Sequence, residues 1–147
     1  MGEVQMPSKL EDDLGFLLAR THRAMRRSLM ALLEPTGITY EQFRVLNALC
    51  EEEDVSQVDL ADRVNADQTS LARMLGRMES AELISRTVDV ADSRVNRIML
   101  TDKGRHLAER MAPQRNRALS RAVQGLGEEE VIELKRLLNQ LYENTRS

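Results

Sequence analysis

Short polar side chains and arginines share one face of a segment near residue 70. Thr69, Arg73 and Arg77 stand at i, i+4 and i+8, which places them on one line of a helix, with Gln68 and Ser70 beside its start. A guanidinium donates paired hydrogen bonds to a guanine edge, and a hydroxyl near a helix N-terminus donates to a phosphate. This face therefore suits noncovalent recognition of an anion or of base edges; the alternative is a solvated helix face with ordinary arginines.

A second charged group lies on a predicted hairpin, whose strands are residues 84–88 and 97–100. Arg94 gives the connecting turn a cation, which is what a hairpin tip needs to enter a narrow minor groove. Asp92, two residues earlier, can pair with Arg94 or with Arg86 and stiffen the turn. The plainer interpretation is a polar tip in which the aspartate only shapes the turn.

The elements that position these two groups are predicted to be mainly helices. Apolar residues recur at helical spacing over residues 10–33, and the last helix is expected over 128–142. The helix that follows the hairpin contains Pro113, where we expect a kink. Three side chains stand where an oxygen would cap a helix N-terminus, namely Thr39, Asp67 and Thr101, and a short helix is expected to begin at Ser56.

The order of these elements predicts a mainly α, α+β fold. Residues 36–104 form a winged helix-turn-helix, and residues 1–35 and 105–147 form long helices with broad apolar stripes. A helix over 10–33 extends roughly 36 Å at about 1.5 Å per residue, more than a small domain can cover. We therefore expect the two outer regions to build an intertwined homodimer. The methionines at 25, 74, 78 and 99 are expected to fill the core.

Composition narrows the classes of function. The 147 residues are 41% hydrophobic and 31% charged, as in a folded globular protein. No apolar run approaches the roughly 18–20 residues of a membrane span, and the N-terminus lacks the pattern of a signal peptide. The single cysteine, Cys50, cannot form an internal disulfide, which fits a reducing compartment. We expect a cytoplasmic protein with no membrane partner.

The net charge of −3 is unusual for a protein that binds nucleic acid. Acidic residues concentrate at 11–13, 51–54 and 128–130, and arginines concentrate at 73–97 and 105–121. The sequence leaves open whether folding separates these charges. The alternative function is therefore a winged-helix module that binds another protein and does not bind DNA.

Catalytic and metal-binding patterns are absent from the sequence. There is no glycine-rich phosphate loop, nucleophile elbow or paired-histidine motif, and the two histidines and one cysteine are far apart. We predict no enzyme activity, no cofactor and no metal site. The glutamates that follow Cys50 are expected to raise its thiol pKa, which disfavours redox sensing. His22 and Arg26 lie within one helical turn beside an apolar stripe and suit a carboxylate ligand; the alternative is an interface histidine bonded to the backbone.

The stretch from Leu60 to Gly104 resembles the MarR family (multiple antibiotic resistance regulators) in three successive motifs. These are Leu83-Ile84-Ser85-Arg86, then Asp92-Ser93-Arg94 in the wing, then Leu100-Thr101-Asp102-Lys103-Gly104. Two positions depart from the family pattern: Glu82 replaces a glycine, and Ser93 replaces the first arginine of the wing. Gly15 stands where a peroxide-sensing branch of the family carries its cysteine, which argues against that mechanism.

The resemblance implies a cytoplasmic homodimer that binds a pseudo-palindromic double-stranded DNA operator and usually represses transcription. It also implies a small aromatic acid or related phenolic effector between the dimer layer and the DNA-reading domain, for which His22 and Arg26 are the candidates. Effector binding would change the spacing of two recognition helices, which fit successive major grooves when about 34 Å apart. The predicted DNA-binding residues are Gln68, Thr69, Ser70, Arg73, Arg77, Arg86, Asp92 and Arg94.

Overall fold

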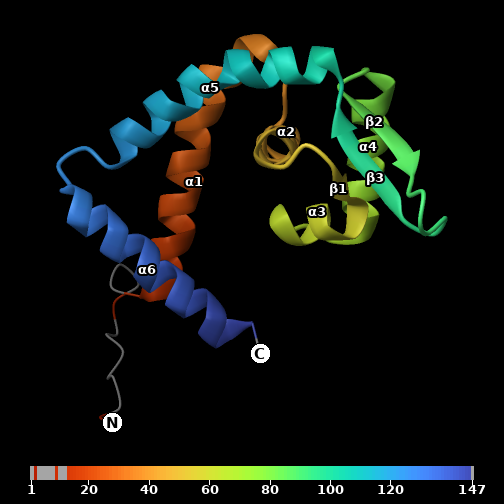
Figure 1. Cartoon of the computed structure of the whole chain (residues 1–147). Coiled ribbons are helices and arrows are strands. Elements are labelled where there is room, and N and C mark those ends of the chain that lie inside the picture. The colour runs from red at the N-terminus through yellow and green to blue at the C-terminus, as the bar shows by residue number, and fades with distance from the viewer. Residues whose placement is uncertain (1, 3–8, 10–12, 147) are drawn as a thin grey trace.

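Helices dominate the chain, and a small sheet lies near its middle (Figure 1). The structure is a computed structural model that describes residues 2, 9 and 13–146. Its elements in chain order are α1 (Leu14–Leu33), the 3₁₀ turn η2 (Glu34–Thr36), α2 (Tyr40–Glu51), β1 (Val55–Ser56), α3 (Gln57–Arg63), α4 (Gln68–Ser80), β2 (Ile84–Val88), β3 (Asn96–Leu100), α5 (Asp102–Ala122) and α6 (Glu128–Thr145).

The helix starts follow from local hydrogen bonds. The backbone N–H of Gln42 donates to Thr39 Oγ1 at 3.2 Å, and the Thr39 N–H donates to Gln42 Oε1 at 3.1 Å, which forms the capping box expected there. Ser56, Asp67 and Thr101 each accept a hydrogen bond from the backbone N–H three residues ahead. The predicted N-caps at Thr39, Asp67 and Thr101 and the predicted helix start at Ser56 are confirmed, so these side chains fix where α2, α3, α4 and α5 begin.

The sheet is antiparallel, and β3 lies between β1 and β2. In the hairpin, Ile84 faces Leu100 and Val88 faces Asn96, so β3 starts one residue earlier than predicted. β1 pairs Val55 with Ile98. The sequence did not indicate β1, because a strand of two residues is too short to show an alternating pattern.

The core lies where α2, α3 and α4 pack with the sheet and with the adjoining ends of α1 and α5. Its fully buried side chains include Leu33, Leu46, Leu49, Leu60, Leu71, Leu75, Met78 and Ile98. Met78 and the partly buried Met74 belong to this core as expected. The same expectation is wrong for Met25 and Met99, which are 42% and 40% exposed.

The corner between α4 and β2 adopts a left-handed backbone without a glycine. Glu82 has a φ of +61°, so the conformation that the family pattern assigns to glycine persists here with a side chain. The start of α5 holds this corner: Thr101 Oγ1 donates to the Glu82 carbonyl at 2.6 Å, and the Thr101 N–H donates to the Leu83 carbonyl at 3.1 Å. A Cβ on Gly104 would lie 2.0 Å from that Leu83 oxygen, so this position admits only glycine.

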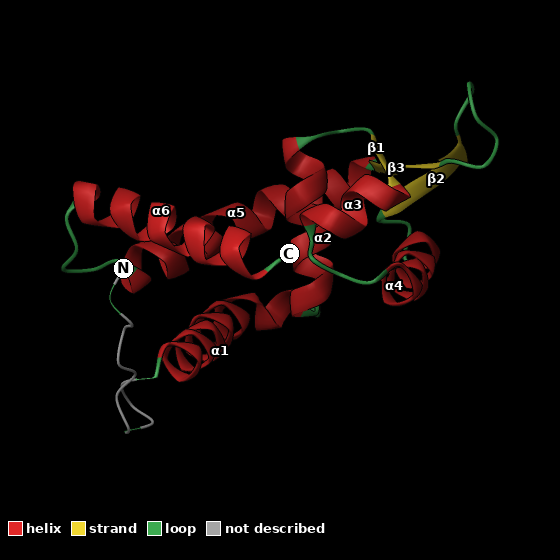
Figure 2. Cartoon of the chain, turned by 90° about the horizontal axis from the view of Figure 1, so that it is seen from below, coloured by secondary structure: helices red, strands yellow, loops and turns green. Residues whose placement is uncertain are grey.

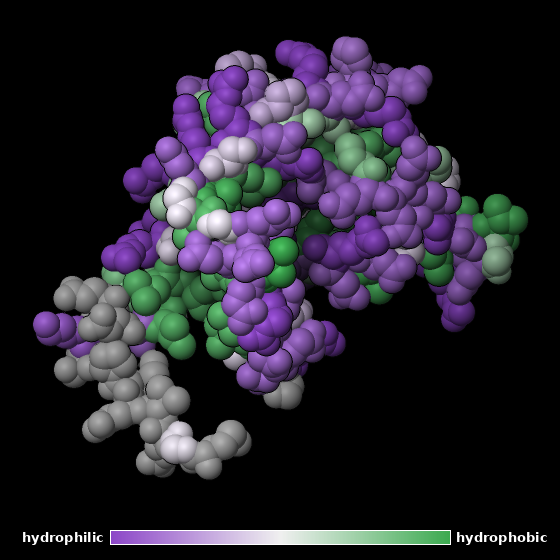
Figure 3. Space-filling model, turned by 60° about the vertical axis from the view of Figure 1, so that its left-hand side comes forward, coloured by the Kyte–Doolittle hydropathy of each residue, from purple (hydrophilic) through white to green (hydrophobic). Residues whose placement is uncertain are grey.

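Helices α1, α5 and α6 extend away from the winged helix (Figure 2). α5 continues through Pro113 and changes direction near its middle, as expected of a proline inside a helix (Figure 1). None of the described residues of α6 is buried. Apolar side chains gather on the side of the molecule seen in Figure 3. The exposed apolar residues of α1 and α6 include Leu14, Leu18, Ile132, Leu134, Leu138 and Tyr142.

Candidate nucleic-acid interface

One face of α4 is exposed because its opposite face belongs to the core. Leu71, Leu75 and Met78 are buried. The exposed side, called here the α4 face, consists of Gln68, Thr69, Ser70, Arg73 and Arg77. Within the described part of the chain, neither of its two arginine side chains forms a salt bridge or a hydrogen bond. The predicted face therefore exists as a surface with unpaired cations.

Arg94 is held in place on the wing by Asp92, a contact called here the Asp92–Arg94 clamp. The N–H and Nε of Arg94 each donate to Asp92 Oδ1 at 3.0 Å, and Nη2 donates to Oδ2 at 3.0 Å. These bonds hold the pKa of Asp92 below its usual value. The Arg94 side chain is 88% exposed, and three of its five N–H donors remain for another acceptor. The wing thus presents a preorganised cation.

Arg86 does not take part in this clamp. Its Nη2 lies 3.5 Å from Glu79 Oε1 on α4, and its side chain is 24% exposed. Of the two pairings that the sequence allowed for Asp92, the one with Arg94 is confirmed and the one with Arg86 is wrong. Arg86 instead joins the first strand of the wing to the last turn of α4.

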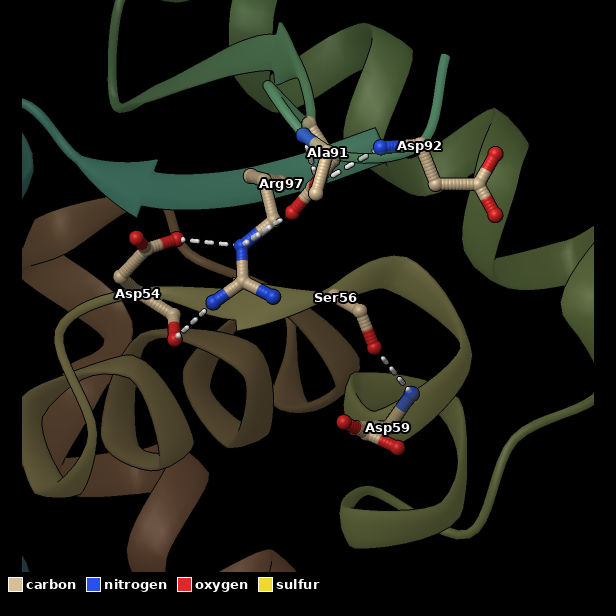
Figure 4. Close-up of polar contacts among 7 residues, drawn as sticks. Asp54, Ser56, Asp59, Ala91, Asp92 and Arg97 are labelled. Carbon is tan, nitrogen blue, oxygen red and sulfur yellow. Dashed lines mark hydrogen bonds and ion pairs between the residues drawn. The ribbon is translucent and has the colours of Figure 1, made fainter. Parts of the chain in front are cut away.

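The root of the wing is held by Arg97, which the sequence did not single out (Figure 4). Its Nε and Nη2 donate to the Asp54 carboxylate and carbonyl at 2.9 and 3.0 Å, and its Nε lies 3.9 Å from Asp89 Oδ2. Asp89 Oδ1 in turn accepts from the N–H groups of Ala91 and Asp92 at 2.8 and 3.0 Å. One guanidinium therefore connects the loop before β1 to the turn that carries the clamp.

The acidic run at 51–54 is largely paired with arginines from three other elements. These pairs are Glu52 with Arg63 of α3, Glu53 with Arg105 of α5, and Asp54 with Arg97 of β3. Surface pairs of this kind contribute little to stability, but they neutralise the local charge. A negative net charge is therefore compatible with an exposed basic face on α4.

A cavity of about 270 Å³ lies between α1, α2 and α5. Both predicted effector residues line it: the His22 ring lies edge-on to the Tyr40 ring at 6.0 Å, and the Arg26 guanidinium lies 4.7 Å from the centre of that ring. Arg26 Nη2 also forms a salt bridge to Glu41 Oε1 at 2.9 Å. α2 and α5 contribute further residues, among them Asn47 and Arg115, for which the sequence held no signal.

Cys50 lies at the end of α2, exposed as a residue but with its thiol partly covered by α5. This partial burial is the largest cause of its raised pKa, and Glu109 and Glu51 add to it, while Arg105 and Arg115 oppose it. The expected direction of the pKa shift is confirmed. Its main cause is burial rather than the acidic run that follows the cysteine.

Residues 38–95 match the family model of the MarR family, and this segment contains the α4 face and the clamp. The chain is similar to the MarR family in this segment and to solved MarR-family structures over most of its length. CouR from Rhodococcus jostii RHA1 bound to p-coumaroyl-CoA is similar, with a TM-score of 0.84 and 26% identity over 96% of this chain and 99% of that one. A mutant of MarR from E. coli complexed with operator DNA has a TM-score of 0.80 and 27% identity over 87% and 92%. BpsR from Bordetella bronchiseptica, whose DNA binding 6-hydroxynicotinic acid regulates, has a TM-score of 0.79 and 27% identity over 88% and 98%.

MarR-family proteins are transcriptional regulators and not enzymes, so this chain is a DNA-binding regulator with a mainly α, winged-helix fold. That assignment favours DNA over the alternative of a protein-binding module. Among the helices that the structure describes, none is long and apolar enough to cross a membrane. The described residues also contain no cluster of histidine, cysteine and carboxylate side chains placed to hold a metal ion.

Proposed function

We propose that this MarR-family protein is a homodimeric repressor that binds a pseudo-palindromic operator and responds to a small ligand. The observation that carries the proposal is the unpaired basic α4 face beside a preorganised wing cation. α4 and the wing project at the same end of the molecule, away from α1, α5 and α6 (Figure 2). A recognition helix in a major groove with a wing cation in the adjacent minor groove fits this arrangement.

The residues of this end would have different roles. Arg73, Thr69 and Ser70 read base edges and nearby phosphate, with Gln68 and Arg77 at the two ends of the same face. Arg94 binds in the minor groove, and Asp92 orients it. Arg86, which is partly buried against Glu79, contributes by fixing the wing to α4 more than by touching DNA.

The dimer would form through the outer helices, in residues 1–35 and 105–147. The exposed apolar side chains of α1 and α6 support this role, since contiguous exposed apolar surface marks an interaction site. A two-fold dimer repeats the α4 face and the wing, which matches a pseudo-palindromic operator. Sedimentation velocity tests this: we expect a dimer at micromolar concentration, and a monomer there would contradict the proposal. Such a regulator acts in the cytoplasm, where its DNA lies.

The effector would bind in the cavity between α1, α2 and α5. The cavity lies between the outer helices and the winged helix, so its occupancy can bias how the two are oriented. CouR is bound to p-coumaroyl-CoA, and 6-hydroxynicotinic acid regulates the DNA binding of BpsR, which supports an aromatic acid or a derivative as the class of ligand here. His22 and Arg26 are the lining residues already expected from the sequence.

A gel-shift titration tests the DNA-binding part of the proposal. The probe is the DNA upstream of the gene that encodes this chain, and the control is a shuffled duplex of the same composition, each at two salt concentrations. We expect preferential binding to the upstream DNA that weakens with salt. Equal binding to both duplexes would contradict recognition of an operator, and binding to neither would support the alternative of a module that binds another protein.

A further inference from the structure

Arg115 carries a buried hydrogen-bond donor that has no acceptor. Its Nε is buried and unpartnered among the described residues, whereas its Nη1 donates to Asn47 Oδ1. No carboxylate of the described chain lies within salt-bridge distance of Arg115. A buried guanidinium donor without a partner is unfavourable, so an arginine kept in this state is suited to an acceptor supplied from outside the chain.

The other arginine of the cavity already has its partners. Arg26 forms a salt bridge with Glu41 at 2.9 Å and lies over the Tyr40 ring. A ligand carboxylate that approached Arg26 would compete with Glu41. Arg115 has no such competitor, because no aspartate or glutamate of the described residues lines the cavity.

The remaining wall sets the size and shape of the ligand. It is mostly apolar and aromatic: Met25, Leu29, Tyr40, Phe43, Ala118 and Leu119. A volume of about 270 Å³ is near the lower end of small-molecule sites, which span roughly 300–1,000 Å³. The cavity therefore fits one aromatic ring with a short acidic substituent; a large carrier group would have to extend through the open side.

We propose that Arg115, oriented by Asn47, binds the carboxylate of a single-ring aromatic acid, whose ring contacts Tyr40, Phe43 and Met25. This inference rests on the proposed effector response and assigns the anion-binding residue to α5 instead of to His22 and Arg26. Asn47 belongs to α2 of the winged helix and Arg115 to α5 of the outer helices. A carboxylate bound at this pair therefore contacts both parts of the molecule and can report cavity occupancy to the DNA-reading end.

Isothermal titration of the full-length protein with benzoate, salicylate and 4-hydroxycinnamate tests this, with benzamide as the uncharged control. We expect at least one acid to bind the wild type at least tenfold more tightly than benzamide. Arg115→Gln should bind the acid roughly ten- to a hundredfold more weakly than the wild type, because it loses charge-assisted hydrogen bonds to the carboxylate. Arg117→Gln, which changes an exposed arginine on the same helix outside the cavity, is the matched control and should bind as the wild type does.

The comparison with Arg26 decides the assignment. A larger loss in Arg26→Gln than in Arg115→Gln would overturn it, as would equal binding of acid and amide, or no binding of any acid, by the wild type. Arg115→Lys keeps the charge without the forked donor, so it should bind with intermediate affinity even if the glutamine variant fails to fold. DNA binding by the ligand-free wild type, measured in parallel, separates failure of this inference from failure of the proposed repressor function.

Discussion

Replacing Arg94 by alanine should flatten the salt dependence of operator binding. The clamp holds the guanidinium of Arg94 on the wing with three N–H donors free and the side chain 88% exposed, so its contact with DNA would release counterions. Each lost phosphate contact reduces the magnitude of the negative slope of log binding constant against log salt by about 0.9. The two wings of a dimer together reduce it by about 1.8. Between 50 and 200 mM salt, the wild type should therefore lose about 12-fold more affinity than the variant.

Fluorescence anisotropy with a labelled operator duplex at four or more salt concentrations measures this slope. Arg94→Lys is the matched control, because it keeps the charge and should keep the slope while losing the forked contact. Ser93→Arg restores the second wing arginine of the family pattern and should steepen the slope. An alanine variant with the wild-type slope would refute the contact between Arg94 and DNA.

Four further predictions follow from other contacts. Arg97→Ala should lower operator affinity several-fold without changing the salt slope, because Arg97 holds the wing to Asp54 and does not contact phosphate; a slope lowered as much as in Arg94→Ala would instead make Arg97 a phosphate contact. Glu82→Gly should stabilise the fold by about 1 kcal/mol, since it removes a left-handed residue with a side chain, and should raise the melting temperature by roughly 2–4 °C; a lower melting temperature would count against strain at this corner. Gly104→Ala should destabilise by about 3 kcal/mol in thermal unfolding, because its Cβ would overlap the Leu83 carbonyl; wild-type stability would show that the corner can move. Because the pKa of Asp92 is lowered, the stability that the clamp adds to the fold is fully present above the ordinary aspartate pKa of about 3.9. This stability is lost only as the pH falls through the lowered pKa. An NMR titration that gave this carboxyl an ordinary or raised pKa would contradict the prediction.

Features set by neighbouring residues were predictable from the sequence. Thr39 and Gln42 cap a helix through atoms three residues apart, and the side-chain oxygen of Asp67 accepts from Ser70 in the same way. The α4 face follows from helical spacing alone, since Leu71 and Leu75 turn inward and the arginines turn outward. Such local signals locate the helix starts and the exposed basic face before any tertiary contact is known.

Features that depend on distant residues were not predictable in the same way. Arg97 and Asp54 are 43 positions apart, and Arg115 and Asn47 are 68 apart, so no local pattern links either pair. Met25 fits the apolar stripe of α1 but lies 42% exposed, because only the C-terminal end of that helix reaches the core of the chain. The cavity between α1, α2 and α5 is likewise built by three separate helices.

Glu82 shows how tertiary contacts can impose a local conformation. Residue 82 is a glutamate where the family pattern has a glycine, so the sequence did not establish the backbone conformation that follows α4. The corner nevertheless keeps a φ of +61°, and the hydrogen bond from Thr101 Oγ1 to its carbonyl holds it there. The close packing of Gly104 on Leu83 adds a second restraint from the same motif. The geometry of this corner is therefore determined by the start of α5 as much as by the residue at the turn.

A stoichiometric anisotropy titration of a duplex from the gene's own upstream region, at about 150 mM salt, tests the dimeric DNA-reading arrangement most directly. Two chains per duplex are expected, with affinity at least about a thousandfold above that for a shuffled duplex, the lower end for specific DNA-binding proteins. One chain per duplex, or equal affinity for the two duplexes, would contradict a two-fold repressor that reads its operator through the α4 face and the wing.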